Sequence, residues 1–250
     1  MRALITGASS GIGAEITKYL DYLGCETIIV ARREDRLKKL QSELIHDCKI
    51  ITLDLSEEEN VFKLIDMTKD VDIDILINNA GFGLFGKFYD TDLDRELEMI
   101  NLNIKALHIL CKEFVKRFKE KNDGYILNVA SSAGFLAGPN LSTYYATKNY
   151  VVRLTEAIYE ELRQNNINVK ISALCPGPVD TEFNKVAHGT FKSKPLTAKK
   201  VAHIAVDKMF KGKLLIFPGL LMKLGNFGMR FVPTKLLLKI IYNYQAKKMK

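Results

Sequence analysis

Cysteine and histidine are scarce in this 250-residue sequence, which contains four of each. The cysteines are 23, 63 and 64 residues apart along the chain, and the histidines are equally scattered. A zinc site or a redox dithiol needs closely spaced pairs, so the sequence predicts no metal site. Because unpaired cysteines are usually buried thiols of a reducing compartment, we expect a cytoplasmic location.

Long hydrophobic runs are also missing. The longest apolar stretch, residues 214–222, is nine residues long and is interrupted by Pro218 and Gly219, whereas a membrane-spanning helix needs about 20 apolar residues. Informative sequence begins at Met1, so we expect no signal peptide. A hydrophobic content of 47% with 26% charged residues excludes a disordered or collagen-like chain. The length favours one α/β domain.

Acidic residues are nearly absent from the last sixty positions. Residues 191–250 contain fourteen lysines and arginines and a single acid, Asp207, so their net charge is +13. The whole chain carries +8, which leaves −5 for residues 1–190. The basic character is therefore a property of the C-terminal quarter.

Short runs rich in β-branched residues are nearly continuously apolar, as is typical of strands covered on both faces. They predict strands at residues 3–6, 26–31, 50–55, 73–78, 125–130, 169–174 and 214–217. Helical spacing predicts helices at residues 12–23, from a capping box of Ser56 and Glu59 to Met67, and at residues 93–118. This alternation predicts a Rossmann-like, doubly wound parallel sheet of about seven strands in a single domain over residues 1–250.

A glycine-rich turn follows the first predicted strand and opens the first predicted helix. Without Cβ atoms the backbone can approach a pyrophosphate, whose charge then lies at the free N–H groups of the helix N-terminus. The spacing is G-x-x-x-G-x-G, and its place between strand and helix favours a dinucleotide site over a tight connection alone. The candidate residues are Gly7, Ser9, Ser10, Gly11, Ile12 and Gly13.

Arg32 and Arg33 follow the second predicted strand, where an acid usually binds the ribose of NAD. A guanidinium suits the 2′-phosphate of NADP instead, so the pair favours NADP(H) over NAD(H). The alternative is a solvated surface pair, because further basic residues follow on a charged helix.

Tyr144 and Lys148 are four residues apart at the start of a predicted helix and therefore share one face of it. A neighbouring ammonium favours the phenolate and lowers the pKa of the phenol, so Tyr144 could protonate a carbonyl oxygen. Tyr145 is three residues before Lys148 and could also reach it.

In their order along the chain, these motifs resemble those of the short-chain dehydrogenase/reductase family. The resemblance includes the NNAG sequence at residues 78–81, Ser131 after the fifth strand, and Pro176 with Gly177 after the sixth, and it covers nearly the whole chain. It implies an oxidoreductase that transfers a hydride between a nicotinamide cofactor, which Arg32 and Arg33 indicate to be NADP(H), and a small-molecule carbonyl compound or secondary alcohol. A homodimer or homotetramer is the expected assembly.

The resemblance also selects among the reactive candidates. It implies that Tyr144, rather than Tyr145, is the acid/base, and that Ser131, rather than Ser132, stabilises the charge that develops on the substrate oxygen. It further implies that Lys148 lowers the pKa of Tyr144 and holds the nicotinamide ribose.

The fourth catalytic residue of the family is an asparagine in the long helix. The pattern of residues 102–106 places it at Asn103, where it would anchor a water that relays protons to Lys148. Asn101 is a rival, and either side chain could merely bend or cap the helix. The remaining cofactor contacts implied by the resemblance are Asp54, Leu55, Asn78, Ala80, Gly81, Pro176, Gly177, Val179 and Thr181.

One departure from the family pattern concerns the cofactor. Many NADP-using relatives have a basic residue in the glycine turn, where this chain has Ser9 and Ser10. The expectation of NADP therefore rests on Arg32 and Arg33.

The substrate is indicated only by composition. A lid is expected at residues 178–200, and with the loop at residues 82–85 it suggests a hydrophobic ketone or aldehyde. The lid residues on which this rests are Phe183, Val186, His188 and Phe191. A lid that packs its own side chains would look the same.

Two other functions are less compatible with the sequence. A non-catalytic, nucleotide-sensing protein of the same fold typically loses the tyrosine or the lysine, and this chain keeps both. A nucleic-acid binder would need an aromatic stacking platform or a recognisable motif beside its basic charge, and we find neither.

Residues 218–250 form a basic and apolar extension that is longer than the last strand needs. Its apolar side either packs on the domain or a sister subunit, or docks on anionic lipid with its lysines at the headgroups. Short apolar stripes usually belong to a core, so we favour packing and expect no more than peripheral membrane contact.

Overall fold

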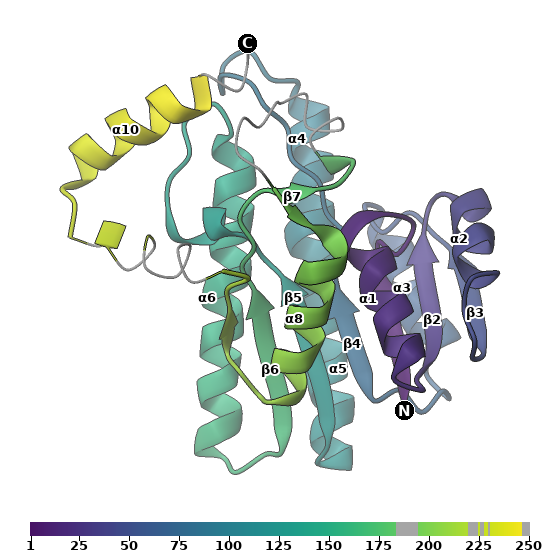
Figure 1. Cartoon of the computed structure of the whole chain (residues 1–250). Helices are drawn as coiled ribbons and strands as arrows, with labels where there is room; N and C mark the ends of the chain where they lie inside the picture. Colours follow the sequence, from purple (N-terminus) through teal and green to yellow (C-terminus); the bar gives the residue numbers. More distant parts are fainter. Residues whose placement is uncertain (184–194, 220–224, 226–227, 230, 247–250) are drawn as a thin grey trace.

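The computed structural model describes residues 1–183, 195–219, 225, 228–229 and 231–246. At its centre is a parallel sheet of seven strands in the order β3-β2-β1-β4-β5-β6-β9 (Figure 1). The strands are β1 (Arg2–Thr6), β2 (Glu26–Ala31), β3 (Cys48–Thr52), β4 (Ile75–Asn78), β5 (Gly124–Val129), β6 (Val169–Leu174) and β9 (Leu215–Ile216). The order reverses between β1 and β4, so the predicted doubly wound fold is confirmed.

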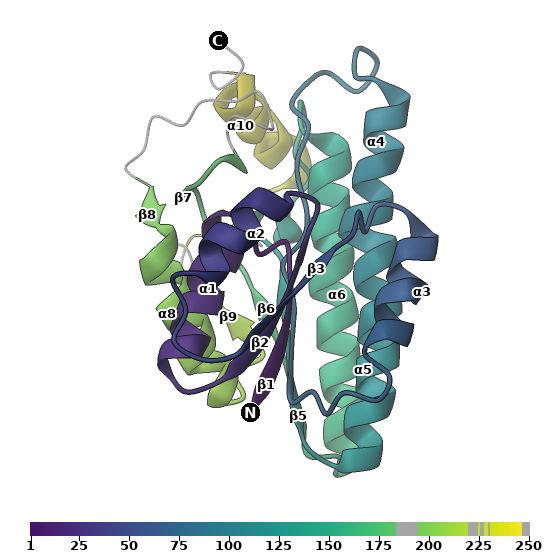
Figure 2. The same cartoon turned by 90° about the vertical axis from the view of Figure 1, so that its right-hand side faces the viewer.

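Helices cover both faces of the sheet (Figure 2). One face carries α1 (Gly11–Tyr22), α2 (Glu34–Gln41) and α8 (Ala198–Phe210), and the other carries α3 (Glu58–Met67), α5 (Leu107–Lys121) and α6 (Ser142–Gln164). Successive strand residues face opposite layers, as Leu4 and Ile5 do in β1, and both are fully buried. This two-sided burial explains why the strands have continuous apolar runs.

The long helix predicted at residues 93–118 is interrupted by a π-helical turn. The chain runs through α4 (Leu93–Ile100) into η1 (Asn101–Ala106) and then into α5. A π-helical turn inserts an extra residue into a helix and reorients a side chain without ending the helix. Such turns often occur at functional sites. Here the turn contains Asn103, which is buried.

The predicted capping box is wrong. The Ser56 hydroxyl donates to Oδ1 of Asp54 at 2.7 Å, and the Ser56 backbone N–H donates to the same oxygen at 3.0 Å. Asp54 therefore draws Ser56 into a turn after β3, a local alternative to capping that aspartate commonly offers. Helix α3 begins behind Glu57, which makes no side-chain cap.

The predicted lid is described only at its two ends. There β7 (Val179–Asp180) pairs in parallel with β8 (Leu196–Thr197) in a separate two-stranded sheet. The predicted lid residues Val186, His188 and Phe191 lie outside the described residues.

The C-terminal extension packs on the domain through one side of α10 (Thr234–Ala246). Ile241 and Gln245 are buried, whereas Leu236 and Ile240 remain about half exposed. Residues 220–224, 226–227, 230 and 247–250 of the extension lie outside the described residues. Over the described ranges, no helix combines the length and apolar character that crossing a bilayer requires.

Candidate active site

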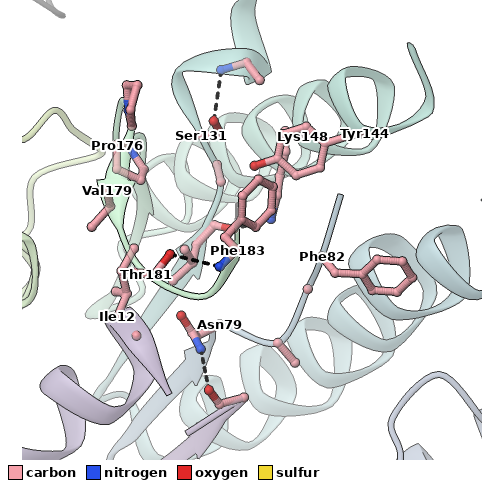
Figure 3. Close-up of a pocket in the computed structure, with 18 of the residues that line it drawn as sticks. Ile12, Asn79, Phe82, Ser131, Tyr144, Lys148, Pro176, Val179, Thr181 and Phe183 are labelled. Carbon is pink, nitrogen blue, oxygen red and sulfur yellow. Dashed lines mark hydrogen bonds between the residues drawn. The ribbon is translucent and has the colours of Figure 1, made fainter. Parts of the chain in front are cut away.

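A cavity of about 860 Å³ lies where the strands end, the usual ligand position in doubly wound sheets (Figure 3). It is lined by most of the residues that the sequence singled out, namely Gly7, Ser9, Ser10, Gly11, Ile12, Arg32, Arg33, Asp54, Leu55, Ala80, Gly81, Ser131, Tyr144, Lys148, Pro176, Gly177, Val179 and Thr181. Gly13, Asn78 and Asn103 were singled out as well but do not line it. Among the described residues, no group of three or more His, Cys, Asp or Glu side chains could hold a metal ion.

The glycine turn fits a dinucleotide. Gly7 and Gly11 have left-handed φ angles of +65° and +57°, which glycine adopts without strain. A Cβ on Gly7 would lie 2.8 Å from the Cα atom of Ala80, so the wall of the cavity has no room for one. Helix α1 begins behind Ser10, which makes no side-chain cap. Its N-terminal amides are therefore available to a pyrophosphate.

Asn79, which belongs to the NNAG motif but was not predicted as a cofactor contact, holds this turn against β4 and lines the cavity. Its Nδ2 donates to the carbonyl oxygens of Thr6 and Gly7, both at 3.0 Å. A Cβ on Gly13 would lie 2.4 Å from that nitrogen, so Gly13 serves the packing of α1 on the turn. The sequence signal for Asn79 was the pair of successive asparagines at a strand end. Neighbouring strand residues point to opposite sides of the sheet, so only one of the two can face the cavity.

Asn78, which was predicted to contact the cofactor, is buried between the sheet and α5, where its Nδ2 donates to Sγ of Cys111 at 3.3 Å. Its Nδ2 donates to Oδ1 of Asn128 at 2.9 Å, and Asn128 donates in turn to Oγ1 of Thr155 at 3.0 Å. Asn78 thus ties β4 to β5, and Asn128 ties β5 to α6. The pair supports the floor of the cavity from behind.

Arg32 lies at the rim between two carboxylates. Its Nη1 donates to Asp54 at 3.2 Å and to Glu98 at 3.1 Å. Burial raises the pKa of Asp54, but hydrogen bonds from Ser56 and the charge of Arg32 outweigh burial and hold this pKa below its ordinary value. Asp54 is therefore ionised, and the guanidinium of Arg32 is fixed along the rim.

Arg33 reaches back to the glycine turn. Its Nη2 donates to the hydroxyls of Ser9 and Ser10, both at 3.1 Å, and its Nη1 donates to Glu182 at 3.0 Å. A guanidinium beside two hydroxyls is a donor set suited to a phosphate. Ser9, Ser10 and Arg33 therefore form a corner whose donors suit an anion, named below the anion-binding corner.

Three candidate reactive groups meet on one side of the cavity (Figure 3). Ser131 follows β5 and caps η2 (Ser132–Phe135) by accepting a hydrogen bond from the N–H of Ala133 at 3.1 Å. Tyr144 and Lys148 lie on the first turns of α6, and Lys148 Nζ donates to the carbonyl oxygen of Val129 at 2.8 Å. Strand β5 thereby positions both the serine and the lysine.

Burial dominates the ionisation of the tyrosine and the lysine. It raises the pKa of Tyr144 to about 12, although a hydrogen bond with Ser131 acts in the opposite direction. It lowers the pKa of Lys148 to about 8. The expectation that Lys148 lowers the pKa of Tyr144 stays a prediction, because burial is the larger effect on this pKa in the protein without cofactor. The Lys148 nitrogen is 5.8 Å from the phenol ring centroid.

Asn103 lies one layer behind the cavity wall. Its Nδ2 donates to the Phe82 carbonyl oxygen at 2.9 Å and to Thr147 Oγ1 at 3.1 Å, and its Oδ1 accepts from the Phe82 N–H at 3.1 Å. A Cβ on Gly81 would lie 2.7 Å from Oδ1 of Asn103 and 3.5 Å from Nζ of Lys148. Asn103 therefore fixes the loop after β4 to α6, close to the lysine.

The cavity becomes apolar beyond Tyr144. The Phe183 ring packs on the Tyr144 ring with centroids 5.3 Å apart, and the Tyr145 ring meets it edge-on at 6.3 Å. The rival Tyr145 is engaged elsewhere, because its hydroxyl accepts from Nε2 of Gln245 on α10 at 2.5 Å. Other lining residues at this end are Leu136, Leu141, Met229, Ile240, Ile241 and Tyr244. The role of α10 as a cavity wall was not predicted from the sequence.

Comparisons with known proteins agree with this geometry. The family model for short chain dehydrogenase matches residues 1–190. An uncharacterized oxidoreductase of Staphylococcus epidermidis is 33% identical over 209 residues, which cover 82% of this chain and 88% of that protein.

Two solved structures are similar over most of the chain. A short-chain dehydrogenase from Sphingobium yanoikuyae in complex with NADPH is 27% identical, has a TM-score of 0.81 and covers 93% of this chain and 96% of that one. A 3-ketoacyl-(acyl-carrier-protein) reductase from Brucella melitensis complexed with NADH is 25% identical, has a TM-score of 0.77 and covers 86% and 95%. The chain is an oxidoreductase that belongs to the short-chain dehydrogenase family.

Proposed function

We propose that the chain is an NADP(H)-dependent enzyme that interconverts a hydrophobic ketone or aldehyde and its alcohol. The observation that carries the proposal is the meeting of Ser131, Tyr144 and Lys148 in the same cavity as a glycine turn that fits a dinucleotide. A non-catalytic sensor would not need these three reactive side chains, so we do not favour it.

In the reducing direction, Tyr144 donates its phenolic proton to the carbonyl oxygen of the substrate. Because burial raises its pKa, the phenol remains protonated near neutral pH and is ready to act as an acid. Ser131 donates a hydrogen bond to the same oxygen and stabilises the negative charge that develops on it. NADPH, when bound, supplies the hydride.

Lys148 acts on the charge left behind. Its pKa of about 8 means that it is mostly protonated near neutral pH. A buried ammonium favours the phenolate that Tyr144 becomes after proton transfer. Lys148 therefore stabilises the product of the proton transfer rather than predisposing the resting phenol to ionise.

Cofactor preference is supported by the anion-binding corner of Arg33, Ser9 and Ser10. One similar structure holds NADPH and another holds NADH, so structural similarity alone does not decide the cofactor preference. The apolar residues around Tyr145 and Phe183 support a hydrophobic substrate.

A carbonyl screen tests the proposal. Ketones and aldehydes of increasing apolar size are incubated with the protein, and the absorbance of NADPH or NADH is followed. We expect oxidation of NADPH with the larger apolar carbonyls, and oxidation slower by about 10²–10⁴-fold with Tyr144→Phe. Faster oxidation of NADH by the wild type would contradict the cofactor assignment, and turnover of polar substrates alone would contradict the substrate class.

A further inference from the structure

A carboxylate already occupies the anion-binding corner. Oε2 of Glu182 accepts hydrogen bonds from Nη1 of Arg33 at 3.0 Å and from Nη1 of Arg36, on α2, at 2.6 Å. Hydrogen bonds from Arg36 and Arg33 lower the pKa of Glu182 to about 2, so the group is ionised at any physiological pH. All three side chains are about 40% exposed, and a soluble anion can therefore reach them.

The position of Glu182 is set by its chain neighbours. Thr181 lies against the glycine turn, where a Cβ on Gly11 would come within 3.1 Å of its Cγ2 atom. Phe183 packs on the ring of Tyr144 (Figure 3). Glu182 is thus held at the cavity between two anchored residues, and the corner and Glu182 line the same cavity.

Carboxylates and phosphates are bound by arginine in the same forked geometry. The guanidinium of Arg33 has five N–H donors, two of its nitrogens are engaged here, and one of them serves Glu182. A phosphate placed against Arg33, Ser9 and Ser10 would lie next to the Glu182 carboxylate and repel it. The phosphate and Glu182 therefore cannot both bind Arg33 favourably.

We propose that Glu182 is a specificity-determining residue whose carboxylate competes with the 2′-phosphate of NADPH for Arg33. The proposal rests on the proposed use of NADP(H). When Arg33 binds the phosphate, Arg36 remains hydrogen-bonded to Glu182. This bond limits the repulsion between the carboxylate and the phosphate. Glu182 thereby makes the preference for NADPH over NADH smaller than the anion-binding corner would give without it.

The test is the affinity of the protein for NADPH and for NADH, measured by isothermal titration calorimetry on the wild type and on Glu182→Gln. Removing one partly exposed competitor should tighten NADPH binding by about threefold to tenfold and leave NADH within twofold. The matched control is Glu34→Gln, which removes an equal charge from α2 but from a pair with Lys38 at 2.7 Å. The control should change neither affinity by more than about twofold.

A second variant changes the competition in the opposite direction. Arg36→Gln leaves Glu182 to Arg33 alone, so NADPH binding should weaken by about twofold to fivefold. In the double variant Arg36→Gln with Glu182→Gln this loss should disappear, because the competitor is gone. A loss that persists in the double variant would mean that Arg36 acts on the cofactor directly.

The outcomes separate this inference from the proposed cofactor preference. Equal binding of NADPH and NADH to the wild type contradicts the preference, yet a gain for NADPH alone in Glu182→Gln would still support competition. A wild type that prefers NADPH, with a Glu182→Gln variant that binds it no more tightly, overturns the inference alone. An equal gain in NADPH affinity in Glu34→Gln also overturns it. The loss of one negative charge anywhere near α2 would then explain the gain without competition for Arg33.

Discussion

The two ends of the cavity are built in different ways. The cofactor end is formed largely by two short runs of consecutive residues, the turn from Gly7 to Ile12 and the pair Arg32 and Arg33. The apolar end combines the loop after β4, the start of α6, Phe183 and α10, which are far apart in the sequence. A site made of consecutive residues depends on backbone geometry, whereas a site made of distant segments depends on tertiary packing. The first kind can be identified from a short motif, and the second kind cannot.

The largest expected effect lies where the two ends meet. Tyr144→Phe keeps the ring and removes the transferable proton, so the rate of NADPH oxidation at saturating substrate should fall by about 10²–10⁴-fold. NADPH affinity should stay within about twofold. Tyr145→Phe is the matched control, since its hydroxyl is bonded to Gln245, and it should keep most of the rate. A greater loss in Tyr145→Phe would move the acid role to Tyr145.

A glycine substitution tests whether backbone geometry governs the cofactor end. Gly7→Ala places a Cβ 2.8 Å from the Ala80 backbone at a left-handed φ of +65°, so dinucleotide affinity measured by calorimetry should fall roughly a hundredfold. Gly24→Ala is the control, with φ +85° but nothing within 4 Å of the added Cβ. It should cost about 1 kcal/mol of stability through backbone strain alone and leave the cofactor affinity unchanged. Similar losses in both variants would indicate general destabilisation.

The two arginines at the cofactor end should differ from each other. Arg33 contacts the hydroxyls of Ser9 and Ser10, whereas Arg32 is held by Asp54 and Glu98. We expect Arg33→Ala to weaken NADPH binding about tenfold and to spare NADH, because a charge-assisted hydrogen bond to phosphate is lost. Arg32→Ala should have a smaller effect on NADPH. Calorimetric titration of both cofactors measures this, and the reverse ranking would place the 2′-phosphate at Arg32.

The same contrast explains how much of the fold could be predicted from the sequence. The strands were predictable because both of their faces are buried, so the apolar runs needed no knowledge of partners. The π-helical turn at residues 101–106 was not, since its apolar spacing continues that of the flanking helices. The choice of Ser56 between capping α3 and bonding Asp54 depends on local geometry that either pattern permits.

The candidate site shows the same division. The motif residues of the glycine turn, Ser131, Tyr144 and Lys148 were found by their order and spacing. Asn78 and Asn79 could not be told apart, because their difference is the side of the strand end that each one faces. The burial that raises the pKa of Tyr144 is likewise invisible in the residues around it in sequence, since it comes from elements that pack on α6 in space.

The smallest expected effect concerns the charge of Lys148 in the protein without cofactor. Burial lowers its pKa from 10.5 to about 8, so the folded chain holds this proton less tightly than the unfolded chain does. The contribution of Lys148 to stability should therefore rise as the pH increases from about 8 towards 10.5. Burial raises the pKa of the Cys111 and Cys175 thiols, and these act with the opposite sign above about pH 9.

A variant comparison isolates the lysine from the thiols. Lys148→Met shares the same cysteines, so the difference in melting temperature between the wild type and the variant cancels the contribution of Cys111 and leaves, of the thiol contributions, only the charge coupling between Lys148 and Cys175. That difference should shift in favour of the wild type by a few degrees, on the order of 1–2 kcal/mol, between about pH 7 and about pH 10. Lys121→Met is the control, because hydrogen bonds to Asp72 and Asp74 raise the pKa of Lys121, and its difference should be flat over this range. A flat difference for Lys148→Met as well would mean that the Lys148 ammonium is solvated. A solvated ammonium would stabilise the Tyr144 phenolate less than the buried position of Lys148 implies.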